Sequence, residues 1–218
     1  MVNSPLNYRF HLGLLTGLAL IFIWSAIGPA DRFTWFLEVL PAVIGVAVLM
    51  ATICRFPLTS LLYQLIWLHA VILLVGGHYT YAEVPLFNWL RDTFELQRNY
   101  YDRVGHFAQG FVPGMIAREI LLRTSPLQPG KWLFFIVTCI CLAISAGYEF
   151  IEWWVAVGTG SAAEAFLGTQ GDVWDTQWDM FLAFCGAIIA QLTLSGLHGR
   201  QLRERGLMSR NPAEEGRV

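Results

Sequence analysis

Residues 131–157 read KWLFFIVTCICLAISAGYEFIEWWVAV, and this stretch decides the class of fold. No charged residue occurs between Lys131 and Glu149, and the apolar residues follow neither a helical nor a strand period. An α-helix rises about 1.5 Å per residue, so a segment of this length can cross about 30 Å of hydrocarbon. We therefore expect a transmembrane helix here.

Similar apolar stretches occur along the rest of the chain. Of its 218 residues, 56% are hydrophobic and 14% are charged, whereas soluble globular proteins carry about 25% charged residues. The sequence predicts an all-α polytopic membrane helix bundle of about six transmembrane helices. We expect a single transmembrane domain over residues 1–200 and a charged tail over residues 201–218. The expected spans lie near residues 12–29, 36–54, 58–77, 102–123, 131–157 and 176–198.

The basic residues predict how these helices are oriented. If the N-terminus lies in the cytoplasm, only four of the 14 basic residues fall outside: Arg32, Arg91, Arg98 and Arg103. This distribution satisfies the positive-inside rule, so both termini and the tail are expected to be cytoplasmic. The net charge of −2 gives no indication of a nucleic-acid partner.

A long connection follows the third expected span. Within it, Leu86, Phe87, Leu90 and Phe94 recur at helical spacing, and charged residues take the other face. This pattern predicts a short amphipathic helix near residues 84–99 that lies on the outer membrane surface. Such a helix could be a plain connector or a lid over a substrate.

Ionisable residues inside spans are costly, so their positions are the main functional signal. The fourth expected span opens with YYDRVGHF, in which Asp102 and His106 are four residues apart and share a helix face. In the fifth span, YEFIEW places Glu149 and Glu152 one turn apart. The first pair could simply be a structural hydrogen bond, whereas two membrane carboxylates must be paired, protonated or metal-bound.

The sixth expected span opens with GDVWDTQWDM, which carries Asp172, Asp175 and Asp179 near one stripe of a helix. Helix starts favour Asp, so the first two could act as caps, but capping does not explain the deeper Asp179. Arg103 is expected beside these acids, either as their counter-ion or as a clamp for an anionic group.

All these groups map to the outer side of the membrane, and together they predict one His- and carboxylate-containing site. Such ligands suit a divalent metal, namely Mg²⁺, Mn²⁺, Ca²⁺ or, less well, Zn²⁺. The expected metal ligands are Asp102, His106, Glu149, Glu152, Asp175 and Asp179. The expected catalytic residues are Glu149 or His106 as base and Arg103 as the group that positions the substrate. GGHYTY at residues 76–81 adds His78, Tyr79 and Tyr81 which, with Asp172, are candidates for substrate binding.

The runs GGHYTY, YYDRVGHF, YEFIEW and GDVWDTQWDM resemble the uncharacterised bacterial inner-membrane family typified by YjdF, over about residues 8–200. This resemblance implies a multi-pass protein of the bacterial inner membrane, without a known reaction. Residues 100–190 are also similar to VanZ-like proteins, which implies that the acids, His106 and the last helix belong to one site. Arg103 replaces the Lys of that pattern, and Glu152 stands where a Gln is common.

Three functions are compatible with these observations. In the first, a cation in the site acts on a lipid or lipid-linked headgroup at the outer leaflet, polarising an oxygen and activating water. The second is a small transporter or proton-coupled carrier, although we expect the inner half of each span to lack a second acidic site. The third is a scaffold or sensor whose polar cluster only holds helices together.

Overall fold

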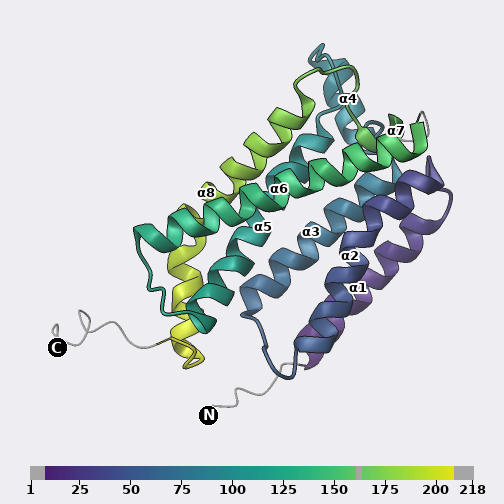
Figure 1. The fold of residues 1–218 in the computed structure, drawn as a ribbon. Helices are drawn as coiled ribbons and strands as arrows, with labels where there is room; N and C mark the ends of the chain where they lie inside the picture. Colours follow the sequence, from purple (N-terminus) through teal and green to yellow (C-terminus); the bar gives the residue numbers. More distant parts are fainter. Residues whose placement is uncertain (1–7, 161–163, 209–218) are drawn as a thin grey trace.

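A computed structural model of the chain describes residues 8–160 and 164–208. The described residues form helices and connecting turns with no strand, which confirms the predicted all-α class. The helices are α1 (Tyr8–Ala26), α2 (Arg32–Thr52), α3 (Ser60–His78), α4 (Pro85–Thr93), α5 (Tyr101–Thr124), α6 (Lys131–Thr159), α7 (Glu164–Leu167) and α8 (Asp175–Glu204). Short helices α4 and α7 lie at one end of the bundle, while α1 begins and α8 ends at the other (Figure 1).

Five of the described helices, α1, α2, α3, α6 and α8, are long and apolar enough to cross a membrane. Helix α5 coincides with the predicted fourth span in position, but it has no comparably long apolar stretch. Its burial explains its composition: twelve of its 24 residues are buried, because α5 packs against α3, α6 and α8. Protein rather than lipid surrounds this helix, so charged side chains can be satisfied along it.

Two predicted elements end differently in the structure. The expected helix over residues 84–99 is shorter, because α4 ends at Thr93 and Glu95 adopts a positive φ of 52°. The last span is longer than expected, since α8 runs through the buried His198 to Glu204. Residues 201–204 of the predicted tail are therefore helical, and residues 209–218 lie outside the described part of the chain.

Helices α5 and α8 touch backbone to backbone at two glycines. A Cβ placed on Gly110 would lie 1.7 Å from the carbonyl oxygen of Ala183, and one on Gly186 would lie 2.2 Å from the carbonyl oxygen of Phe107. Small residues are a general means by which membrane helices approach closely. This contact holds the first turns of α5 and α8 side by side.

A buried polar cluster fastens the opposite end of α5. Glu119 accepts hydrogen bonds from the backbone N–H and hydroxyl of Thr59, from Nε2 of His198 and from Arg123. Arg118 in turn donates to Nδ1 of His198 at 2.6 Å. The expectation that the inner half of each span lacks a second acidic site was therefore wrong. Glu119 is fully buried within α5.

The glycine contact gives a stability prediction. Gly186→Ala places a methyl group against the backbone of α5, so the two helices must separate, and we expect a loss of about 1–3 kcal/mol. Gly196→Ala, on the same helix, is the matched control, because a Cβ there meets nothing within 4 Å. Thermal unfolding of the detergent-purified variants measures both, and equal melting temperatures would contradict the assigned contact.

Candidate functional site

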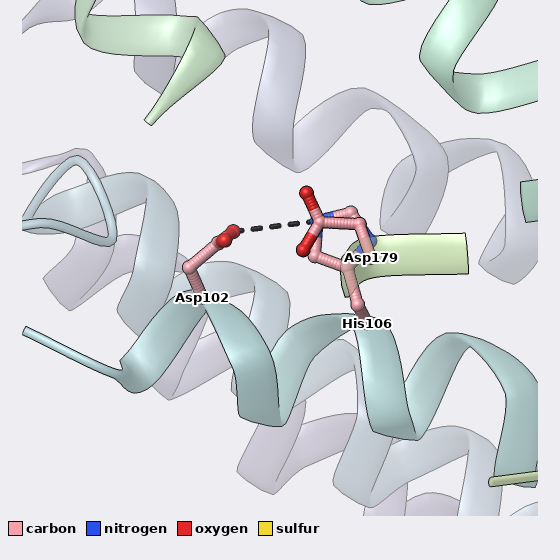
Figure 2. Close-up of side chains that lie close together, drawn as sticks. All are labelled: Asp102, His106 and Asp179. Atoms are coloured by element: carbon pink, nitrogen blue, oxygen red, sulfur yellow. Dashed lines mark ion pairs between the residues drawn. The ribbon is translucent and has the colours of Figure 1, made fainter. Parts of the chain in front are cut away.

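Asp102, His106 and Asp179 converge between α5 and α8 at the end of the bundle that carries α4 and α7. Asp102 and His106 occupy successive turns of α5, and Asp179 reaches toward them from α8 (Figure 2). Nε2 of His106 lies 3.3 Å from an oxygen of Asp102 and 3.7 Å from an oxygen of Asp179. All three side chains are buried. The predicted proximity of these residues is thus present in the structure.

Gln109 sets the orientation of the His106 ring. Nδ1 of His106 lies 3.0 Å from Oε1 of Gln109. Because an amide oxygen only accepts, Nδ1 carries a hydrogen and donates it. Nε2 is then left facing two carboxylates, Asp102 and Asp179. Three acceptor atoms meet favourably only around a proton or a metal cation.

Helix α6 contributes the other two predicted carboxyl groups. Glu149 and Glu152 are both buried and form a second group with His106, whose potential ligand atoms all lie within 4.8 Å of one another. The first group, Asp102, His106 and Asp179, meets the same limit. One oxygen of Glu149 is buried without a hydrogen-bond partner among the described residues. His106 is therefore the residue common to two arrangements that could hold a cation.

Two arginines neutralise the acids at the start of α8. Arg103 binds Asp179, and lies 2.9 Å from Asp175 and 3.0 Å from Asp172. Arg98 lies 2.7 Å from the same Asp175 oxygen. Asp175, an expected metal ligand, is thus an ion-pair partner and belongs to neither group that could hold a cation.

Arg98 also ties two loops together. It donates to the backbone carbonyls of Gly168 and Thr169, just before α8, and lies 3.6 Å from Asp102 at the start of α5. Its position explains why the segment after α4 is not helical, since the chain must turn to bury this guanidinium.

A cavity of about 230 Å³ adjoins the cluster, and we call it the polar cavity because several ionisable side chains lie in its otherwise mostly apolar lining. Its lining includes Asp102, His106 and Glu152, together with Glu38 of α2 and Tyr148 of α6. Sequence reasoning missed Glu38, although a single acid within an apolar span is a recognisable signal. Gln109 and Tyr148 carry no such signal, because polar but uncharged residues are common in helices.

Tyr81 is wedged into the wall of this cavity by an unusual turn. Thr80 and Tyr81 both have a positive φ of 55°, which is uncommon for residues other than glycine. The ring then fills the space beside Gly76 and Gly105, where any Cβ would lie within 3 Å of it. Burial, followed by the nearby Glu38 carboxylate, raises the pKa of Tyr81 well above its usual value. The hydroxyl of Tyr81 therefore stays protonated.

The other expected substrate contacts lie elsewhere. His78 stacks on Trp24, with Nδ1 3.0 Å from the carbonyl oxygen of Ser25, and Tyr79 packs beside it. Both therefore support α1 and do not line the polar cavity. Asp172 lines a second, more open pocket of about 710 Å³ together with Arg98, Arg103 and Trp178.

Negative charge dominates the cluster. Six carboxyl groups are buried around His106, whereas the cations available nearby are the guanidinium groups of Arg98 and Arg103 and the imidazole itself. The six acids are Glu38, Asp102, Glu149, Glu152, Asp175 and Asp179. Buried carboxylates without counter-ions are strongly unfavourable. The site therefore retains protons or takes up a cation.

Comparison with known proteins agrees with this architecture. The family described as "Predicted membrane protein (DUF2238)" matches residues 10–200. The chain belongs to this family. It is also 52% identical over 192 residues to the protein named "Inner membrane protein YjdF" from Escherichia coli (strain K12), covering 88% of this chain and 92% of that protein. No solved structure shows a match.

These matches confirm the predicted resemblance to the YjdF-like family. Together with the five apolar helices, they identify a multi-pass protein of the bacterial inner membrane. The family description states no reaction, so the chemistry of this DUF2238 protein must be argued from the site itself.

The ion-pair network yields a second prediction. Arg103→Gln leaves the buried Asp179 without its guanidinium partner, and we expect the variant to lose about 3–5 kcal/mol of stability. Adding Asp179→Asn should restore part of this loss, because both partners are then neutral. Arg91→Gln, which breaks the exposed pair with Asp92, is the control and should leave the melting temperature unchanged. A single Arg103 variant as stable as that control would contradict the network.

Proposed function

We propose that this protein binds a divalent cation at His106 and uses it on the headgroup of a membrane lipid or lipid-linked substrate. The observation that carries the proposal is the geometry around Nε2 of His106, which faces oxygens of Asp102 and Asp179 at 3.3 and 3.7 Å. Gln109 holds the opposite nitrogen in the donor state, which is the usual arrangement behind a metal-binding histidine.

The ligand chemistry supports a cation rather than a purely structural cluster. Oxygen ligands with one imidazole suit Mg²⁺, Mn²⁺, Ca²⁺ or Zn²⁺. The unpartnered buried oxygen of Glu149 is available either to a cation or to a proton. The excess of buried carboxyl groups over guanidinium groups gives a further electrostatic reason for a cation to bind.

A cation in this position would polarise a phosphoryl or acyl oxygen and lower the pKa of a bound water molecule. One oxygen of Glu149, which belongs to the group that shares His106, would bind the cation, and its other oxygen would act as the base. Arg103 is engaged by three aspartates but also lines the open 710 Å³ pocket with Trp178.

Elemental analysis of detergent-purified protein tests the cation. After exposure to Mg²⁺, Mn²⁺, Ca²⁺ and Zn²⁺ in turn, the wild type should retain one of them stoichiometrically. Glu149→Gln should lower its affinity at least tenfold, because the amide removes one charged ligand without changing the shape. Glu204→Gln is the matched control, since Glu204 forms an exposed pair with Arg200. Absence of every metal from the wild type would overturn the proposal.

A carrier is the second candidate, and the buried Glu119–His198 cluster at the opposite end of α5 is the observation that favours it. A proton path would need groups that exchange protons at both ends. Wild type reconstituted in vesicles with a pH-sensitive dye should show no proton flux if the enzyme proposal is right. Flux that Glu119→Gln abolishes, with Glu204→Gln as control, would instead establish the carrier.

A further inference from the structure

A large apolar cavity lies beside the acidic site. It measures about 430 Å³, is partly open, and is lined by residues of α1, α2, α3 and α5. Its walls are formed mainly by aliphatic side chains, among them Leu18, Val46, Ile66 and Val112. Water is a poor occupant of such a cavity, because an apolar wall offers it few hydrogen bonds. A flexible apolar ligand fits these properties.

The apolar cavity adjoins the polar one. Pro41, His69 and Leu73 line both cavities. The rest of the polar cavity is lined by residues that include Glu38, His106 and Glu152. The rest of the apolar cavity has predominantly apolar walls. A molecule that occupied both would therefore have a polar head among carboxyl groups and an apolar chain among aliphatic side chains.

The length of the cavity is close to the depth that one acyl chain fills. Along α2 it extends from Pro41, next to the acidic site, to Ile53 near the opposite end of that helix. At 1.5 Å per residue this corresponds to about 18 Å. Half of the hydrocarbon thickness is about 15 Å, which is the depth that one acyl chain fills.

The cavity also has an entrance from the side. Helices α1 and α2 each pack on α3 but make almost no direct contact with each other. They meet at the acidic end, where Nε1 of Trp35 donates to the Ser25 hydroxyl at 2.9 Å. Further along, a smaller apolar cavity of about 230 Å³ separates them, lined by Leu15 and Val43 among others. Both of these side chains are partly exposed on the lipid-facing surface.

We propose that the cavity between α1, α2, α3 and α5 binds an acyl chain of a membrane lipid, whose head then lies in the acidic cavity beside His106. The lipid enters laterally between α1 and α2. This inference rests on the lipid-headgroup part of the proposed function, and it is independent of whether a metal binds.

Gly45 of α2 provides the test. It lines the apolar cavity, and a Cβ there would meet nothing within 4 Å, so a larger side chain can grow into the space. Gly45→Phe should fill the volume that the chain would occupy. Gly13→Phe is the matched control, because Gly13 of α1 also has open space around it and lines neither apolar cavity.

Delipidated protein is incubated with dioleoyl phosphatidylethanolamine, and the lipid retained per chain is measured by native mass spectrometry. Wild type and Gly13→Phe should each retain about one lipid, and Gly45→Phe should retain at least tenfold less. Equal retention by Gly45→Phe, or no retention by the wild type, would overturn the inference. If the unfolding temperature of Gly45→Phe differs from that of the wild type, Ala42→Leu replaces it, because this is a smaller addition to the same cavity wall. Lipid retention by Ala42→Leu then tests the inference.

Metal content measured in the same samples separates the two proposals. Gly45→Phe should keep its cation while losing lipid, and Glu149→Gln should keep lipid while losing the cation. Lipid retention without any metal would support the cavity and overturn the cation. Metal binding with equal lipid retention in all variants would support the cation and overturn the lipid-binding cavity.

Discussion

The closeness of α5 and α8 is the constraint on which the rest of the structure depends. Gly110 and Gly186 permit their backbones to touch, and no side chain fits between them. Because helices are stiff, this contact determines which residues of α5 lie opposite which residues of α8 along the whole length of both helices. One end brings Asp102 and His106 to Asp179, and the other brings Glu119 to His198. Both polar clusters are thus consequences of one apolar, steric feature.

The two clusters differ in how fully they are satisfied. Glu119 accepts from a backbone N–H, a hydroxyl, an imidazole and a guanidinium, and His198 is bonded through both ring nitrogens. Such a network stabilises the ends of α3 and α8 and leaves no open coordination. Around His106, by contrast, acceptors face acceptors, and a Glu149 oxygen has no partner among the described residues. Both clusters are charged, but in the described part of the chain only the cluster around His106 has polar atoms without hydrogen-bond partners. This difference is why we assign the functional site to the His106 cluster.

The sequence predicted the spans and most of the acidic site, for a physical reason. The length of an apolar segment identifies a transmembrane span without knowledge of the neighbouring helices. Residues three or four apart, such as Asp102 and His106, lie on the same face of a helix. What could not be predicted depends on helices that are distant in sequence. Glu38 lies at the site because α2 packs on α3. Asp175 is not among the potential metal ligands because it is paired with two arginines. The position of His78 away from the polar cavity could not be predicted for the same reason, since its partners belong to α1.

The burial of α5 also bears on how the protein is made. Helix α5 leaves the ribosome before α6 and α8, yet Arg103 pairs with aspartates of α8 and its preceding loop, and Glu119 pairs with His198 of α8. Alone in hydrocarbon, these charges would carry a heavy penalty. Stable insertion of α5 therefore has to wait for the two following segments. The second half of the chain, from α5 to α8, is accordingly expected to enter the bilayer as one unit beside helices that are already in place.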